Sequence, residues 1–167
     1  MLTISPAVAA DIPQLAGLLG LLFAQEADFS PDHARQERAL GLLLADPRQG
    51  ALFAAHAQGE LVGMVSLLFT ISTAAGGPAC WLEDLVVRAD RRRQGIGARL
   101  LTQAVAAARA RGCLRMSLLT DQVNADAQRF YARHGFATSA MMAMRLTLDA
   151  APGAPSAGGA PPTMTNR

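Results

Sequence analysis

Lysine is absent from this sequence, and all 15 basic residues are arginine. Charged side chains make up only 17% of the chain, and the formal net charge is +2. A charge this close to zero gives no sign of a nucleic-acid or membrane partner, because such partners attract a strong positive excess. The lack of lysine also excludes a P-loop, since that motif depends on a Gly-Lys-Ser/Thr sequence.

Cysteine is scarce, and the two that occur, Cys80 and Cys113, have the spacing of neither a metal site nor a redox motif. The histidines His33, His56 and His134 are also dispersed, so we expect no metal. Both cysteines are expected to be reduced core residues, which suits a cytoplasmic protein.

Long apolar runs are missing too, since nothing approaches the ~18 residues of a membrane span. The N-terminus has neither the basic region nor the apolar run of a signal peptide. Even so, 51% of the residues are hydrophobic, enough for a core without disulfides or metals. We therefore expect one soluble domain, 1–148, followed by an Ala-, Pro- and Gly-rich tail, 149–167, that is disordered.

Hydrophobic periodicity and the positions of glycine and proline predict an alternation of strands and helices. The expected strands are Leu2–Val8, Ala51–Ala57, Glu60–Thr73, Cys80–Arg88, Leu114–Thr120 and Phe136–Leu148. The expected helices run from Asp11, as N-cap, to about Glu26, from after Ser30-Pro31 to about Ala45, from Ile96 to Gly112 and from Asn124 to His134. This order predicts an α+β or mixed α/β fold around one sheet.

A basic loop with two glycines separates the strand that ends at Arg88 from the next helix. It reads Arg92-Arg93-Gln94-Gly95-Ile96-Gly97. The first N–H groups of a helix are unpaired and lie at its positive end, so they bind anions. The glycines let the backbone approach a ligand, and the arginines suit a diphosphate. A dinucleotide fingerprint would need a third glycine where Leu100 stands, whereas a solvated arginine run before an ordinary helix stays an alternative.

The stretch from Glu83 to Ala98 resembles motif A of the GCN5-related N-acetyltransferases, the GNAT family, and the resemblance continues through Asn124–Phe136. It implies the acyl-CoA N-acyltransferase fold, a mixed and mostly antiparallel sheet with helices on both faces. It also implies a splay between the strand around Leu85–Val87 and the strand Leu114–Thr120, with acetyl-CoA bound there as cosubstrate.

In that family the pantetheine arm pairs with the strand backbone, carried here by Leu85, Val86 and Val87. The pyrophosphate meets backbone N–H groups of the loop and helix start. By resemblance these belong to Arg92, Arg93, Gln94, Gly95, Ile96, Gly97 and Ala98.

The implied reaction is acetylation of a primary amine by direct attack. An alkylamine has a pKa of about 10.4, so a base must take its proton before it attacks. Glu83 and Asp84 are the candidates, and alternation places them on opposite faces, with Glu83 on the face of Trp81 and Leu85. Family members often use the glutamate position, so Glu83 is the preferred base; Asp84 or a water chain stays open.

Tyr131 is the only tyrosine, and its surroundings, Phe130 to Phe136, resemble a Phe-Tyr-x-x-x-Gly-Phe signature of the family. There the hydroxyl lies near the coenzyme sulfur and protonates the thiolate. Asn124 lies two helical turns earlier, on the same face, toward the cofactor. Asn124 also fits a plain N-cap, and Tyr131 also fits an amphipathic core residue.

The acceptor is not specified by the sequence, and small-molecule and peptide amines both fit. In the family the first two helices wall the acceptor side, and their junction, Gln25–Asp32, carries acids beside Phe29 that suit a cationic amine. A polar helix-loop-helix turn explains the same residues.

Other functions stay open. The protein could use another acyl-CoA or a hydroxyl acceptor, be a non-catalytic acyl-CoA sensor, or bind nucleic acid through Arg91–Arg93. Homodimers are common in the family.

Overall fold

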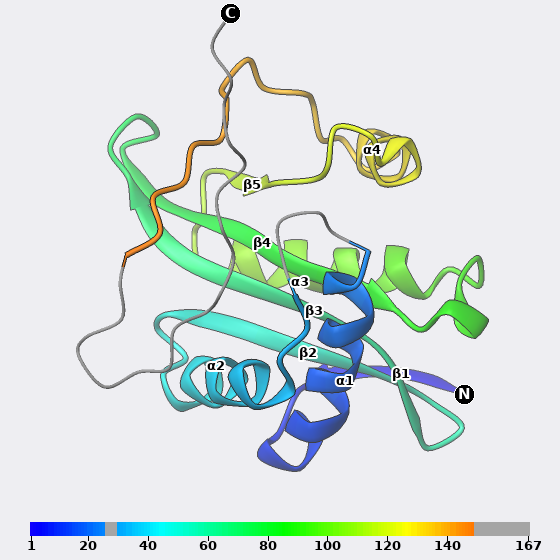
Figure 1. Ribbon diagram of the computed structural model, residues 1–167. Helices are drawn as coiled ribbons and strands as arrows, with labels where there is room; N and C mark the ends of the chain where they lie inside the picture. The colour runs from blue at the N-terminus through cyan, green and yellow to red at the C-terminus, as the bar shows by residue number, and fades with distance from the viewer. Residues whose placement is uncertain (26–29, 149–167) are drawn as a thin grey trace, which may run out of the picture.

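The computed structural model describes residues 1–25 and 30–148. Its strands form one five-stranded sheet in the order β1-β2-β3-β4-β5 (Figure 1). They are β1 Leu2–Pro6, β2 Gly50–Ala57, β3 Glu60–Ser72, β4 Gly77–Val87 and β5 Met116–Leu118. The first four pair antiparallel in sequence order, and β5 joins β4 in parallel at one edge. The sheet is therefore mixed and mostly antiparallel, as expected.

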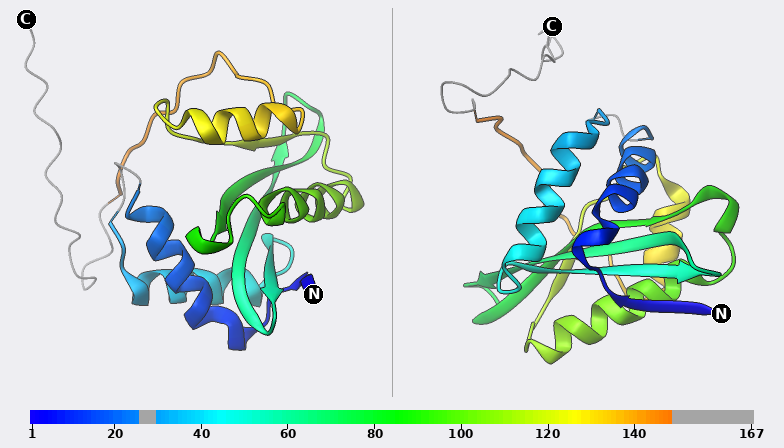
Figure 2. Two further views of the ribbon diagram at one scale, coloured as in Figure 1. Left: turned by 90° about the vertical axis from the view of Figure 1, so that its right-hand side faces the viewer. Right: turned by 90° about the horizontal axis from the view of Figure 1, so that it is seen from below.

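Helices cover both faces of this sheet (Figure 2). They are α1 Ile12–Phe23, α2 His33–Ala45, α3 Ile96–Ala110 and α4 Ala125–Arg133. The first two pack on one face and α3 on the other, while α4 lies beside β5 at the edge. Within the described residues, no helix has the length and apolarity needed to span a membrane.

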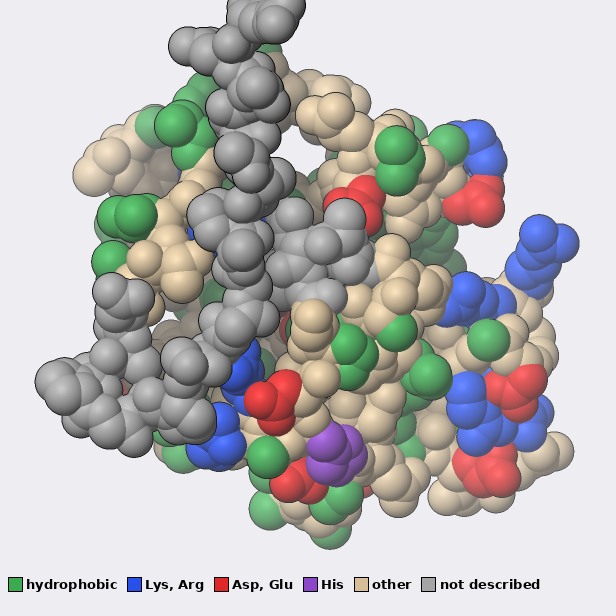
Figure 3. All heavy atoms as spheres, in the orientation of Figure 1, with side chains coloured by type: hydrophobic (Ala, Val, Ile, Leu, Met, Phe, Trp, Pro, Cys, Tyr) green, Lys and Arg blue, Asp and Glu red, His purple; other side chains and the backbone are tan. Residues whose placement is uncertain are grey.

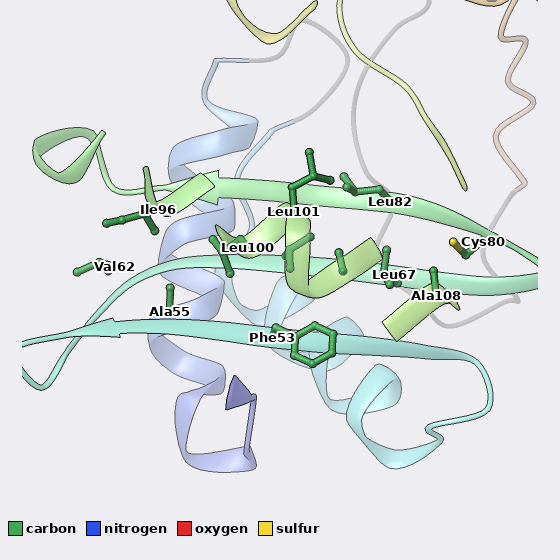
Figure 4. Packing of buried hydrophobic residues seen from close by; sticks show 12 residues of the cluster. Phe53, Ala55, Val62, Leu67, Cys80, Leu82, Ile96, Leu100, Leu101 and Ala108 are labelled. Carbon is green, nitrogen blue, oxygen red and sulfur yellow. The ribbon is translucent and has the colours of Figure 1, made fainter. Parts of the chain in front are cut away.

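The core lies in two layers, one on each side of the sheet. On one side Leu100 and Leu101 of α3 pack onto Leu67 and Leu82 of β3 and β4 (Figure 4). The opposite layer joins α1 and α2 to the other face of the same strands. Each leucine buried in this way stabilises the fold by about 1.5–3 kcal/mol, so these layers fix where β4 and α3 lie.

The two cysteines, distant in sequence, are close in the fold. Both are free thiols; Cys80 is buried on β4, and Cys113, which follows α3, is partly buried. Burial, together with the neighbouring Cys113, raises the pKa of the Cys80 thiol to about 12. Cys80 is therefore a protonated core residue at neutral pH.

Asp11 does not cap α1, contrary to the prediction. A short 3-10 turn, Ala9–Asp11, precedes the helix, and the Asp11 carboxylate accepts the N–H of Val8 at 2.9 Å. The same carboxylate lies 3.5 Å from Nε2 of His56. The Asp11 side chain thus bonds within the turn before α1.

The helix α1 ends at Phe23. Its predicted end at Glu26 lies outside the described residues, as do Asp28, Phe29 and the tail.

The prediction of a last strand over Phe136–Leu148 is wrong: residues 136–148 form no regular secondary structure. Met142, Met144, Leu146 and Leu148 have the alternation of a half-buried strand, yet each is at least 80% exposed. A strand needs backbone partners, and this segment pairs with none of the five. The β5 strand is also shorter than the predicted Leu114–Thr120.

Candidate functional site

β4 and β5 separate after a short paired stretch. Cys80–Leu82 pair with Met116–Leu118, whereas the rest of β4, Glu83–Val87, has no partner from β5. One edge of β4 is therefore open along Leu85, Val86 and Val87, the residues expected to pair with the pantetheine arm. An unpaired strand edge presents N–H and C=O groups that accept another extended chain.

The loop after β4 turns sharply into α3. Gly95 has φ +79°, in the left-handed region that favours glycine, and Arg93 has φ +60°. The helix then begins at Ile96, so the N–H groups of Ile96, Gly97 and Ala98 belong to its first turn and have no intrahelical partner. The Gln94 side chain donates to the carbonyl of Asp90 at 3.4 Å, within the loop. The predicted donors thus lie together at the end of β4.

Arginines of this corner fall into two groups. Arg88 donates to Glu60 at 2.9 Å and to Asp90 at 2.7 Å, and Arg91 lies 3.4 Å from Glu60 and 3.6 Å from Asp90. Basic and acidic side chains gather at the end of the molecule where this loop lies (Figure 3). Arg88 and Arg91 are thus partly buried and paired with Glu60 and Asp90.

Arg92 and Arg93 form the second group. Both are exposed, and no ion pair among the described residues involves either of them. Arg92 Nε donates to the Val87 carbonyl at 3.1 Å, which holds its guanidinium beside the open end of β4. Free amides and two arginines without an acidic partner are what an anion such as a diphosphate requires, so these residues fit that group.

α4 comes against the start of α3. A Cβ on Gly97 would meet Leu85 and Phe130 at 3.7 Å, so β4, α3 and α4 converge at this glycine. The Asn124 side chain accepts the N–H of Ala127 at 3.1 Å, which confirms its prediction as N-cap. Tyr131 packs edge-on against Phe130 and Phe136, with ring centroids 5.2 and 5.5 Å away. The ring of the tyrosine is therefore fixed by aromatic packing.

Burial raises the pKa of both Tyr131 and Asp84, and the charge of Asp84 acts on Tyr131. Burial, and then the charge of Asp84, raise the pKa of Tyr131 to about 12. Burial also raises the pKa of Asp84 to about 6, a shift that a hydrogen bond from Ser66 opposes and the charge of Glu83 reinforces. The phenol is thus protonated at neutral pH, while the carboxyl group of Asp84 changes its protonation state only about one pH unit below neutral pH. Glu83 is exposed on the strand beside them.

The predicted alternation along β4 is wrong at this point. Leu82 and Leu85 both pack against the α3 layer, although strict alternation would place them on opposite faces. A bulge causes this, because Leu67 pairs with Leu82 and Ser66 with Asp84, so that Glu83 has no partner on β3. Trp81 and Leu85 consequently do not share a face.

Ser66 is the site residue that sequence reasoning missed. It lies on β3, is 2% exposed, and its hydroxyl contacts Asp84 at 2.8 Å. The available signal was weak: a lone serine inside the otherwise apolar run Leu61–Leu68. As for metals, the described part of the chain has no cluster of three or more His, Cys, Asp or Glu residues that could hold one.

Comparison with known proteins agrees with this geometry. A family model described as the acetyltransferase (GNAT) family matches residues 18–136. The match includes the splayed strands, the basic loop and Tyr131. The fold and site therefore define an acetyltransferase-type protein, and the chain belongs to the GNAT family.

Among the proteins similar to the chain are two curated relatives and one solved structure. Aminoglycoside N(6′)-acetyltransferase type 1 of Serratia marcescens is 32% identical over 145 residues, 84% of this chain and 98% of the relative. Aminoalkylphosphonate N-acetyltransferase of Salmonella typhimurium is 37% identical over 81 residues, 48% of this chain and 53% of the relative. An integron cassette protein from the Cole Harbour Salt Marsh metagenome superposes with TM-score 0.76 at 27% identity, covering 87% and 90% of the two chains.

Proposed function

We propose that this protein transfers the acetyl group of acetyl-CoA to a primary amine of a small polar molecule, with aminoglycosides as the first class to test. The observation that carries the proposal is the similarity to the aminoglycoside acetyltransferase along 98% of that protein. The shorter match to an aminoalkylphosphonate N-acetyltransferase also supports a small amine. Acetyl-CoA supplies the acetyl group as a thioester, the donor that the family uses.

The open edge of β4 supports cosubstrate binding. In this proposal the backbone of Leu85, Val86 and Val87 pairs with the pantetheine arm. The pyrophosphate is held by backbone N–H groups and side chains of the loop and first helical turn, Arg92, Arg93, Gln94, Gly95, Ile96, Gly97 and Ala98. Asn124 and Tyr131 belong to α4, which meets α3 at Gly97, and in this proposal they line the cosubstrate site beside β4.

The chemistry is proposed to be direct attack. The amine loses a proton to a carboxylate of β4, Glu83 or Asp84, and its nitrogen then bonds to the acetyl carbon while the carbon–sulfur bond breaks. The Tyr131 hydroxyl donates a proton to the departing sulfur, and the acylated nitrogen releases its second proton, so that the hydroxyl is reprotonated through solvent. No covalent acyl-enzyme is needed, and the buried Cys80 thiol, with its pKa of about 12, is unsuited to form one.

The test is release of free coenzyme A thiol from acetyl-CoA in the presence of a panel of amines. The panel contains aminoglycosides with a 6′-amine, aminoalkylphosphonates, polyamines, amino acids and peptides, and products are checked by mass for one added acetyl group. Release with an aminoglycoside and little with peptides supports the proposal. Binding of acetyl-CoA by calorimetry with no release for any amine would instead identify an acyl-CoA sensor.

A further inference from the structure

The bulge in β4 decides where its two neighbouring acids lie. Glu83 occupies the extra position, and Asp84 is opposite Ser66 in the β3–β4 register. Asp84 shares a sheet face with Val86, which packs against α1, whereas Leu85 packs on the α3 side. Bulges are common beside active sites because they redirect a side chain. Here the result is one partly buried carboxylate next to one exposed carboxylate.

Ser66 holds Asp84 at two points. Its hydroxyl donates to Oδ2 of Asp84 at 2.8 Å and accepts the Asp84 backbone N–H at 3.1 Å. A serine hydroxyl has a single hydrogen to donate, so its donor is fully committed to the carboxylate. Because Ser66 itself is 2% exposed, solvent does not compete for these bonds. The side chain and the main chain of Asp84 are therefore fixed together, at the first residue after the bulge.

No ion pair among the described residues gives Asp84 a cationic partner. α1, which packs on the same face, has no titratable residue, and neither does β5. On α2, His33 pairs with Glu37 and Arg35 with Asp32, and Arg38 is exposed. Of the two arginines of α3, Arg99 donates to the Leu2 carbonyl at the β1 side of the sheet, and Arg109 lies in the last turn of the helix. Among the described residues, Asp84 takes part in no ion pair, and the charge that raises its pKa further is that of Glu83.

We propose that Asp84 is the base that takes the proton of the acceptor amine and that Ser66 is the positioning residue that holds it for this role. The inference rests on the proposed function. Oδ2 is bound to Ser66, so Oδ1 receives the first proton of the ammonium group; the amine nitrogen then forms its bond to the acetyl carbon as the carbon–sulfur bond breaks. Tyr131 supplies the proton that the sulfur acquires, and the acylated nitrogen gives up its second proton, which restores the Tyr131 hydroxyl through solvent. The proton on Asp84 passes to solvent. Glu83 is exposed to solvent, and its charge raises the pKa of Asp84.

The test is the pH dependence of kcat/KM for wild-type enzyme and for Asp84→Asn, Ser66→Ala and Glu83→Gln. For wild type, kcat/KM should fall on the acidic side with an apparent pKa near 6, which is the acidic limb of the profile. Asp84→Asn should have no such limb, and its rate should be lower by about 10²-fold or more. Ser66→Ala removes a bond that favours the charged form, so its limb should move to higher pH. Glu83→Gln removes a negative neighbour, so its limb should move to lower pH and persist.

Ser72→Ala is the matched control, because Ser72 is a second buried serine of β3 whose hydroxyl accepts the N–H of Ala75 in the following turn. Its limb should coincide with that of wild type. An Asp84→Asn enzyme that keeps the limb, or a Glu83→Gln enzyme that loses it, overturns the assignment. A Ser66→Ala limb that does not move overturns the positioning role, even if turnover falls.

Carbon-13 NMR titration of aspartate carboxyls gives an answer that needs no turnover. One resonance should titrate near pH 6, vanish in Asp84→Asn and titrate higher in Ser66→Ala. If wild type has no such resonance, the inference about Asp84 is overturned, whereas the proposed acetyl transfer is still tested separately by the amine screen. If the resonance is present but the protein acetylates no amine, the proposed function is overturned, and with it the role of Asp84 as base.

Discussion

Tyr131 and Asp84 show at the residue scale how burial suits a side chain to a task. The phenol has few polar neighbours and a negative charge nearby, and both conditions favour its protonated form. A proton donor that is fully protonated at neutral pH is available in every catalytic cycle. Its ring is held by Phe130 and Phe136, so the hydroxyl can be removed without disturbing the packing.

Tyr131→Phe should therefore lower kcat by about 10²-fold while the KM for acetyl-CoA and the melting temperature stay near the wild-type values. The reason is that phenylalanine keeps the aromatic contacts and removes only the proton. Steady-state kinetics and a thermal melt measure both effects. Tyr131→Ala is the contrast, since it should lose stability as well as rate. An unchanged kcat in Tyr131→Phe would remove the hydroxyl from the mechanism.

At the scale of elements, the junction between β4 and α3 contains two kinds of arginine: those that pair with acids and those that form no ion pair among the described residues. Arg88 is a component of the loop, because Glu60 on β3 and Asp90 in the next turn both bind it. Arg93 has an exposed side chain and no ion pair among the described residues, and it lies directly before the helix start. The two positions thus test charge at the proposed phosphate site against charge elsewhere in the same loop.

Arg93→Gln should weaken the affinity for coenzyme A by about three- to tenfold, with the difference from wild type shrinking as salt is raised. Arg88→Gln, the matched control, should leave that affinity nearly unchanged, because its guanidinium is already bound by two carboxylates. Isothermal calorimetry at two salt concentrations measures both. An equal loss in the two variants would point to the loop conformation rather than to a phosphate contact.

For the whole molecule, Asp84 has a cost in stability. Its pKa is about 6 in the folded protein and near 3.8 when the chain is unfolded. Between these values the unfolded state has released a proton that the folded state still binds, so stability falls as pH rises through this range. Above pH 6 the folded protein contains a partly buried carboxylate that forms no ion pair within residues 1–25 and 30–148, and the full penalty is present.

Asp84→Asn should accordingly be more stable than wild type at pH 8, by on the order of 2 kcal/mol, although it loses activity. The difference should shrink as the pH is lowered from 6 toward 4, because wild-type Asp84 is then protonated too. Chemical denaturation at pH 8, 6 and 4.5 measures this. Glu83→Gln, which changes an exposed carboxylate on the same strand, should show no comparable gain. Equal stability of Asp84→Asn and wild type at pH 8 would contradict the account.

Much of the fold was predictable because local patterns define it. The apolar periodicity of α3, the Gln58-Gly59 turn between β2 and β3 and the cap at Asn124 are each encoded within a few residues. The basic loop could also be located, since a strand, two glycines and a helix start occur together in the sequence. The alternation of apolar and polar residues over 136–148 predicts a strand, but a strand also needs a partner, and this pattern does not supply one.

By itself, the sequence determined the order of the elements, the glycine loop at the start of α3 and the presence of two acids and one tyrosine in suitable segments. Only the tertiary structure decided which acid is buried, because the bulge opposite Ser66 arises from pairing between two strands. It also decided which arginines of the loop pair with acids, since Glu60 contacts Arg88 from a different strand. Both depend on contacts between residues distant in the chain, and a local pattern contains no information about such contacts.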